Sequence, residues 1–250
     1  MKPLTGVESK LSRASWMITY SDIVTLLLTF FILTMVILNE ARRTLYVYID
    51  TLLIEAEQEL KRYTSDAEQD DVIFITRSTK GIKIVISSAK LFDSNRAEIK
   101  EGFKPTLEAI GRVLKESTVI RADALVSAGN YELAEIGALA NRWSPLYKAI
   151  DRSGQMLKVE IRVEGHTDNQ PIISGEYETN LELSTARALR VLSFLSNTSQ
   201  IPERKFSALG YGEYRPIANN ETEGGRALNR RVEIYLDAEL INRDELTYQL

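Results

Sequence analysis

The sequence contains no cysteine and a single histidine, and each of these shortages excludes a class of function. Without cysteine the chain has no disulfide bonds and no thiolate metal sites. With His166 alone, a multi-histidine metal centre is excluded. The net charge is −4 and no basic face stands out, which argues against nucleic acid as a partner. No motif places an acid, a nucleophile and an oxyanion donor together, so we expect no catalytic residues, no metal and no cofactor.

Charge is scarce over residues 16–38, WMITYSDIVTLLLTFFILTMVIL, where Asp22 is the one charged side chain. About 20 apolar residues in a helix are enough to cross the hydrocarbon core of a bilayer. The sequence therefore predicts one transmembrane helix over 16–38. An ionised aspartate inside such a span costs about 2.5–3.5 kcal/mol on insertion scales. A simple anchor has no use for that cost, so we expect Asp22 to be functional.

Two threonines share the helix face of Asp22. At 100° per residue, Thr25 and Thr29 fall within a sector of about 60° that includes Asp22, while the rest of the helix surface is apolar. This strip predicts a face that meets protein or water rather than lipid. The alternative is that each threonine hydroxyl only bonds back to a carbonyl of its own helix.

Residues 1–15 place Lys2, Lys10 and Arg13 ahead of the span. By the positive-inside rule, this segment is expected in the cytoplasm and everything after Leu38 on the other side of the membrane. The apolar run is longer than the core of a signal peptide and lacks an A-x-A cleavage site. We therefore expect it to remain as a single anchor.

Residues 39–71 are dense in charge and predict a juxtamembrane helix that runs into a linker. Its apolar stripe near helical spacing consists of Leu45, Tyr48, Leu52 and Leu53. One interpretation is a passive spacer, above all from Glu55 onward. The other is a plug over residues 41–62, which packs on partner helices or on the membrane face and blocks ion flow.

A compact domain is expected over 72–240, followed by a tail at 241–250. Alternating β-branched runs at 72–79 and 81–87, with Lys80-Gly81 between them, predict a hairpin. Further strands are predicted at 157–165 and 230–238, and helices at 102–115 and 181–195. This order predicts an α+β fold with helices packed on one face of a mixed sheet. The segment 117–156 is rich in alanine and interrupts the pattern.

Four motifs in the second half of the chain carry a family resemblance. GHTDNQPI (165–172) is followed by N-x2-L-S-x2-R-A-x2-V-x3-L from Asn180 to Leu195, then by ALGYGEYRPIANN (208–220) and EGGRALNRRVEI (223–234). This region resembles the OmpA-like peptidoglycan-binding domain. The run WMITYSDIVTLLLTFF ahead of it is similar to the flagellar stator subunit MotB and its sodium-driven counterpart PomB.

The resemblance implies a B-type stator subunit of an ion-driven rotary motor, most simply the flagellar motor, in the bacterial inner membrane with its C-terminal domain in the periplasm. Asp22 would bind and release the coupling ion, H+ or Na+, beside Thr25 and Thr29. A lone span cannot enclose an ion pathway. The resemblance therefore implies a homodimer inside a ring of a multi-pass MotA-like partner.

In the outer domain, the resemblance implies that Asp168 and Arg187 hold the diaminopimelate of the peptidoglycan stem. An aspartate suits the ammonium of this ligand, and an arginine fork suits its carboxylate. Asn180 and Leu183 lie on the same helix face as Arg187. We expect His166 to be a structural histidine. Two interpretations are open for Arg226, Asn229, Arg230 and Arg231: contact with glycan, and a structural network at the domain edge, which we expect.

Alternative functions remain open at this stage. The segment 117–156 is longer than the usual connection in this family, which leaves room for a non-flagellar motor such as a Zorya-like anti-phage stator. A passive OmpA-type wall tether is a second alternative, and Asp22 argues against it. A wall-cutting enzyme is a third, which the lack of a catalytic motif disfavours.

Overall fold

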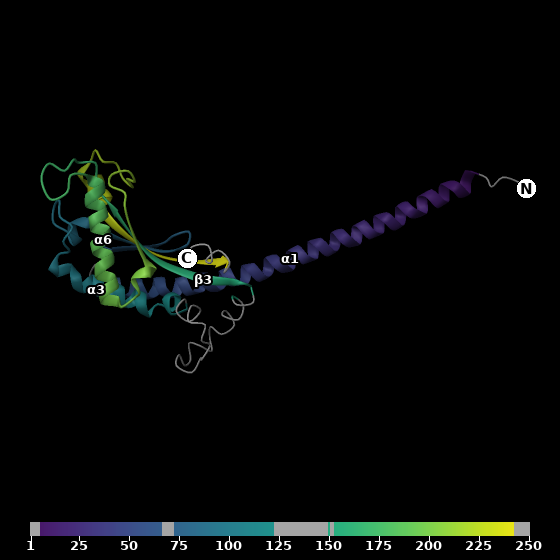
Figure 1. Ribbon diagram of the computed structural model, residues 1–250, viewed down its shortest axis with the longest axis horizontal. Coiled ribbons are helices and arrows are strands. Elements are labelled where there is room, and N and C mark those ends of the chain that lie inside the picture. Colours follow the sequence, from purple (N-terminus) through teal and green to yellow (C-terminus); the bar gives the residue numbers. More distant parts are fainter. Residues whose placement is uncertain (1–5, 67–72, 123–149, 151–152, 243–250) are drawn as a thin grey trace, which may run out of the picture. The chain divides into compact units, whose positions relative to one another are not determined.

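The computed structural model describes residues 6–66, 73–122, 150 and 153–242. The chain divides into two compact units, Met1–Val47 and Tyr48–Leu250, and each is described here by itself. Helix α1 (Gly6–Asp66) contributes residues to both (Figure 1).

In the first unit, α1 contains the apolar segment predicted from the sequence. Among the described residues, this helix holds the one stretch that is long and apolar enough to cross a membrane, judged by length and composition. Its large apolar side chains, including Leu26, Phe30 and Leu33, are exposed within the chain itself. Such a surface needs lipid or partner helices to cover it.

The second unit is built on a five-stranded sheet with the strand order β1-β2-β5-β3-β4. The β3–β4 pair is parallel and the other pairs are antiparallel, so the sheet is mixed as predicted. The strands are β1 (Ile73–Arg77), β2 (Gly81–Ser87), β3 (Gln155–His166), β4 (Phe206–Gly210) and β5 (Arg231–Asn242).

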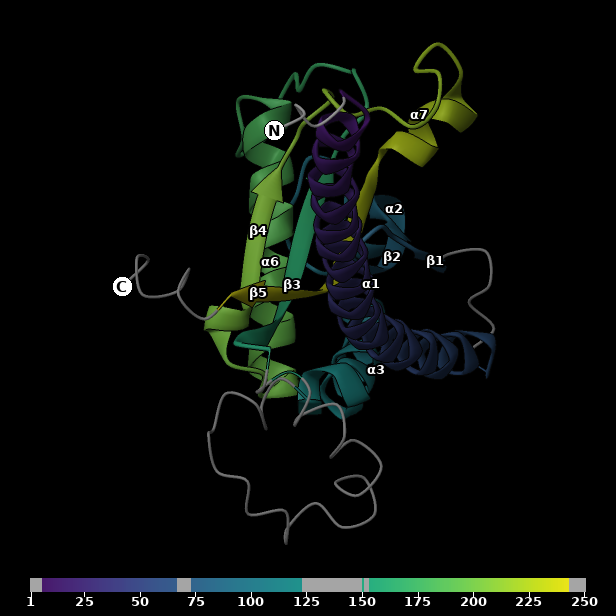
Figure 2. The ribbon, with the colours of Figure 1, turned by 90° about the vertical axis from the view of Figure 1, so that its right-hand side faces the viewer.

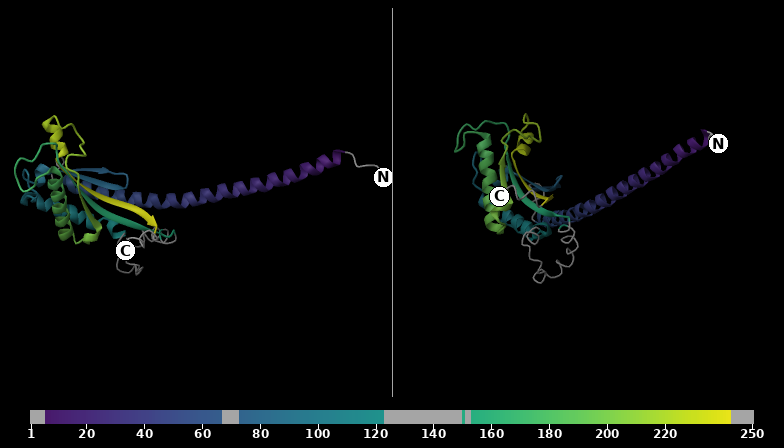
Figure 3. Two further views of the ribbon diagram at one scale, coloured as in Figure 1. Left: turned by 45° about the horizontal axis from the view of Figure 1, so that its top comes forward. Right: turned by 45° about the vertical axis from the view of Figure 1, so that its right-hand side comes forward.

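Helices α3 (Lys104–Glu116) and α6 (Asn180–Ser199) lie on the same side of this sheet (Figures 1 and 3). Helix α6 packs on β3, β4 and α3 and forms the crossover between the parallel strands β3 and β4. The shorter helices are α2 (Ser88–Leu91), α7 (Glu223–Asn229) and the 3-10 helices η1 (Glu101–Phe103) and η3 (Glu203–Lys205).

The two faces of the sheet differ in polarity. Ile84 on β2, Ile234 on β5 and Val163 on β3 are all buried on the face that carries the helices. The neighbouring positions point the other way and are polar, as with Lys83 and its cross-strand partner Tyr235. The predicted fold class, an α+β domain with helices on one face of a mixed sheet, is confirmed.

The last part of α1 belongs to this second unit. An ion pair between Asp50 of α1 and Arg77 of β1 joins the two elements. The buried apolar residues of this helical segment are Ile49, Leu52, Leu53, Ala56 and Leu60. The compact unit therefore begins upstream of the start near Val72 that the sequence suggested. The interpretation of the chain from Glu55 onward as a passive spacer is wrong for its described part, because the apolar stripe continues at spacings of three and four through the charged residues.

Two other segments, the C-terminal end of the sheet and residues 117–156, also need to be compared with the sequence-based prediction. Strand β5 extends to Asn242, so the first residues of the expected tail belong to the sheet. Most of the segment 117–156 lies outside the described residues. Of its described part, Val119, Ala122 and Ile150 are buried.

Candidate functional site

An open cleft of about 430 Å³ lies where α6 begins, beside the residues that follow α2 and β3. The predicted wall-binding residues all line it: Asp168, Asn180, Leu183 and Arg187. Figure 2 shows α7 at the same end of the sheet, and Glu223 and Arg230 bring this helix to the cleft wall.

Close backbone contacts hold the cleft elements together. A Cβ on Gly165, near the end of β3, would lie 2.1 Å from the carbonyl oxygen of Ser184 in α6, so only glycine permits this approach. The amide of Thr167 donates to the carbonyl of Gly212 at 2.9 Å. The start of α6 is capped by Thr179, whose side chain accepts a hydrogen bond from a backbone amide of the first turn. The loop that carries Asp168 is thereby fixed beside α6.

Asp168 is a buried carboxylate whose charge is already compensated. One oxygen accepts a hydrogen bond from Nη1 of Arg230 at 2.6 Å, and the other accepts from the amide of Gln170 at 3.2 Å. Arg230 also donates through Nη2 to Glu223 at 2.7 Å. Burial lowers the pKa of Arg230, but the hydrogen bonds to Glu223 and Asp168 outweigh it and the net shift is upward. Glu223, Arg230 and Asp168 thus form a chain of alternating charges.

Arg187 is buried beneath the loop after α2. Its Nε donates to the carbonyl of Arg96 at 2.9 Å, and its Nη2 donates to the carbonyl of Asp93 at 3.2 Å. Burial lowers the pKa of Arg187 to about 10, with the charge of Asp168 acting in the opposite direction. The guanidinium is therefore protonated at neutral pH. Its Nη1 makes no hydrogen bond within the described residues and remains available for a carboxylate.

The two other predicted residues have supporting positions. Nδ2 of Asn180 donates to the carbonyl of Gln170 and to a carboxylate oxygen of Glu213, both at 3.0 Å. This amide ties the Asp168 loop to the start of α6, and Asn180 also lines the cleft. Leu183 is buried and contributes an apolar surface to the cleft.

Sequence reasoning placed Arg230 in a structural network, whereas the structure puts its guanidinium in the cleft. Its neighbours Asn229 and Arg231 do make structural contacts. Asn229 is fully buried and accepts from the amides of Ile217 and Ala218, and Arg231 bonds to Glu233. The sequence signal was ambiguous because adjacent residues that lead into a strand point to opposite faces, and nothing in the run of arginines says which one faces the cleft.

A second group of charged side chains lies on the sheet face opposite the helices. Nε2 of the buried His166 is 3.6 Å from Glu164 and 4.0 Å from Glu233, and its ring stacks on Tyr211. Among the described residues this is the one trio with metal-ligand types at suitable spacing. Glu164 is already paired with Arg162, and Glu233 with Arg231. A divalent cation would leave excess positive charge in this buried group, so the geometry favours a structural network.

In the first unit, the threonine hydroxyls bond within their own helix. Oγ1 of Thr25 donates to the carbonyl of Ser21 at 2.7 Å, and Oγ1 of Thr29 donates to the carbonyl of Leu26 at 2.9 Å. Their hydroxyl protons are therefore occupied in the described helix. The oxygen lone pairs keep the capacity to coordinate a cation.

Comparison with known proteins finds a family match for each of two parts of the chain. Residues 6–44 match the family described as membrane MotB of the proton-channel complex MotA/MotB, and residues 144–230 match the OmpA family. The chain is MotB-like and carries an OmpA-family domain. The first match covers the apolar segment, and the second covers the cleft residues from Thr167 to Arg230.

Individual relatives agree with this assignment. Uncharacterized protein YtxE of Bacillus subtilis is 25% identical over 255 residues, which cover 90% of this MotB-like chain and 89% of the relative. Motility protein B of the same organism is 28% identical over 184 residues, 74% of this chain and 56% of the relative. Among solved structures, the cell wall anchor of the T6SS from Pseudomonas aeruginosa has a TM-score of 0.50 at 27% identity and covers 72% of this chain and 97% of that chain.

Proposed function

We propose that this chain is the B-type stator subunit of an ion-driven rotary motor, most simply the flagellar motor. The proposal rests on two features found together in one MotB-like chain. One is an apolar segment of α1, residues 16–38, in which Asp22 is the single charged residue. The other is a cleft lined by both an acid and an available guanidinium. Asp22 binds and releases the coupling ion, a proton or a sodium ion. The OmpA-family domain fixes the complex to peptidoglycan.

The cleft suits the zwitterionic end of a diaminopimelate side chain. Asp168 is the acceptor for its ammonium group, and Nη1 of Arg187 is the donor for its carboxylate. Arg230 forms an ion pair with Asp168, so an incoming ammonium must share this carboxylate with it. Ligand binding then replaces part of an existing ion pair, which favours a ligand that brings both charges.

The proposed assembly rests on the match to a family described as membrane MotB of the proton-channel complex MotA/MotB. One helix cannot surround an ion pathway, so two copies of this chain lie within a ring of multi-pass MotA-like subunits. The N-terminus is cytoplasmic, and the OmpA-family domain is periplasmic at the bacterial inner membrane.

The ion-carrying role is tested by Asp22→Asn in cells that express the partner subunit. The amide keeps the size of the side chain but cannot carry the ion, so torque is expected to vanish while the amount of protein in the membrane fraction is unchanged. Asp22→Glu retains a carboxylate and is expected to keep part of the torque. Full torque in the Asp22→Asn variant would refute the role of Asp22.

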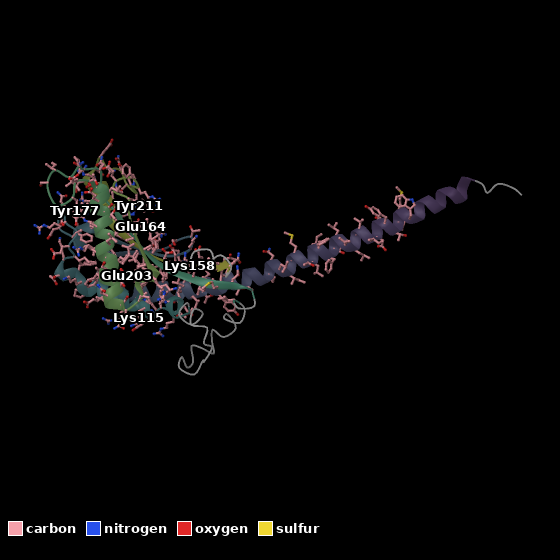
Figure 4. All side chains as sticks on the ribbon, viewed as in Figure 1. Lys115, Lys158, Glu164, Tyr177, Glu203 and Tyr211 are labelled. Carbon is pink, nitrogen blue, oxygen red and sulfur yellow. The ribbon has the colours of Figure 1, made fainter. Side chains whose placement is uncertain are left out.

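Wall binding is tested with the full chain in detergent and purified peptidoglycan. Asp168→Asn removes one charge of the site, and losing one partner of such a pair costs about 2–5 kcal/mol, or roughly 30- to 3,000-fold in affinity. Glu203→Gln is the matched control, because Glu203 lies at the opposite end of α6 (Figure 4). Equal retention of the Asp168→Asn variant and wild type would exclude the cleft as the wall site.

A passive wall tether is the second candidate, and one comparison favours it: the solved T6SS protein is described as a cell wall anchor. The two functions share wall binding and differ only at Asp22. A tether predicts that Asp22→Asn has no effect in any assay in which wild type is active.

A further inference from the structure

A second cleft adjoins the first along α6. It has a volume of about 790 Å³, and both clefts are lined by Ser94 and Asn95. The proposed function occupies only the smaller one. The end of a diaminopimelate side chain is one part of a longer peptide, and the adjoining cleft offers space for the rest of that molecule.

One face of α6 runs through both clefts. Leu183 and Arg187 line the first cleft, while Arg190, Phe194 and Asn197 line the second. These positions follow one another at spacings of three and four, so they form a continuous strip on one side of the helix. A ligand held by Arg187 and lying along this strip meets Arg190 next.

The wall of the second cleft opposite α6 consists of two loops that contact each other. Asn95 adopts a left-handed conformation with φ of 55°, and its Nδ2 donates to the carbonyl of Ser174 at 3.1 Å. Gly175 has φ of 141°, a conformation that residues with side chains rarely adopt, and a Cβ added there would lie 3.4 Å from Cβ of Asn95. The loops around residues 95 and 175 are therefore joined across the rim. Arg187 holds the first of them through its two hydrogen bonds to backbone carbonyls.

The charges of the second cleft indicate the ligand. Arg96 and Arg190 are exposed guanidinium groups that form no ion pair within the described part of the chain. Lys104, in contrast, is paired with Glu101. The acidic side chains of the lining are Glu98 and Glu176. A lining with both signs of charge suits a peptide with its own carboxylates better than a polyanion.

We propose that this second cleft binds the stem peptide beyond its diaminopimelate residue, and that Arg190 binds a further carboxylate of that peptide. The inference rests on the proposed wall-binding function of the first cleft. It predicts that the domain distinguishes a whole stem peptide from free diaminopimelate, and that Arg190 carries part of this preference.

The test measures two soluble ligands by calorimetry on the full chain in detergent: meso-diaminopimelic acid, and a stem tetrapeptide that contains it. Wild type is expected to bind the tetrapeptide more tightly than the free amino acid. Arg190→Gln is expected to weaken tetrapeptide binding about tenfold, since a hydrogen bond to a charged group contributes about 1.5 kcal/mol or more. It should leave binding of the free amino acid unchanged. Arg190→Lys is expected to restore part of the loss.

Arg204→Gln is the matched control, because Arg204 is exposed on η3 and lines neither cleft. An Arg190→Gln variant that weakens neither ligand, or both equally, overturns the role of the second cleft while the first cleft stands. If Asp168→Asn leaves both ligands bound as in wild type, the proposed wall site fails instead. A wild-type chain that binds neither ligand overturns both proposals.

Discussion

Arg187 has two roles that a single substitution cannot separate. Its Nε and Nη2 donate to the carbonyls of Arg96 and Asp93, and the residue also lines the cleft, where Nη1 is the proposed donor to the ligand. We expect Arg187→Ala to abolish wall binding and also to lower the free energy of unfolding by about 1–3 kcal/mol, because buried carbonyls lose their donors. Urea denaturation of a soluble 48–250 fragment measures this. Arg190 lies about one turn further along α6 at an exposed position, so Arg190→Ala should change the free energy of unfolding by less than about 0.5 kcal/mol. Equal losses of stability in both variants would contradict the structural role of Arg187.

The carboxyl group of Glu233 is expected to make the stability of the domain depend on pH in the acidic range. Burial raises the pKa of its carboxyl, but hydrogen bonds from Tyr235 and Arg231 outweigh burial and hold the pKa below its ordinary value of 4.5. Because the pKa is lower in the folded state, the resulting stability is present above about pH 4.5 and is lost as pH falls through the folded-state value. We expect Glu233→Gln to be less stable than wild type at neutral pH and to lose less stability between neutral and acidic pH. Unfolding curves across this range measure the difference. Parallel curves for the two proteins would contradict it.

The residues of the site could be predicted from motifs, whereas their individual contacts could not. The family pattern around Asn180 and Arg187 indicated which side chains gather in the cleft. It did not indicate that Asn180 is occupied in holding the Asp168 loop, nor that Arg230 pairs with Asp168. Those partners come from segments distant in the sequence, and only the tertiary fold brings them together.

At the scale of elements, the segment of α1 from residue 48 onward is part of the domain core. Leu60 is 1% exposed, so Leu60→Ala is expected to lower the free energy of unfolding by about 2–5 kcal/mol. Ile54 on the same helix is 41% exposed, and Ile54→Ala should have a much smaller effect. Urea denaturation of the 48–250 fragment compares the two. If both variants match wild type, this helical segment does not pack on the domain.

The elements that were predictable have strong periodicity, and the ones missed are short or polar. The hairpin at β1 and β2, the strand β3 and the helix α6 all have regular apolar spacing. Strand β4 has the five residues FSALG, none of which is β-branched, so it lacks the strand signal of β1, which is equally short. The end of α1 was expected to be helical, but its role was interpreted as that of a spacer, because many charged residues separate its apolar ones.

At the scale of the whole molecule, the proposal assigns ion coupling and wall anchoring to separate units of one chain. Asp22 lies in the first unit and Asp168 in the second. Their variants should therefore fail in different ways. We expect Asp22→Asn to keep full retention on peptidoglycan and to lose torque, because the cleft is untouched.

Asp168→Asn should show the converse, with ion conduction retained and peptidoglycan retention lost. Torque is lost in this variant too, since an unanchored stator rotates with its load. Conduction is measured as the change in internal pH or sodium when the partner is co-expressed, and retention by pull-down on purified wall. Adding Asp22→Asn to the Asp168→Asn variant should stop its conduction, because ion flow depends on the Asp22 carboxylate whether or not the chain is anchored. If Asp168→Asn conducts and retains like wild type, or if Asp22→Asn releases the chain from the wall, the division of roles between the two units is wrong.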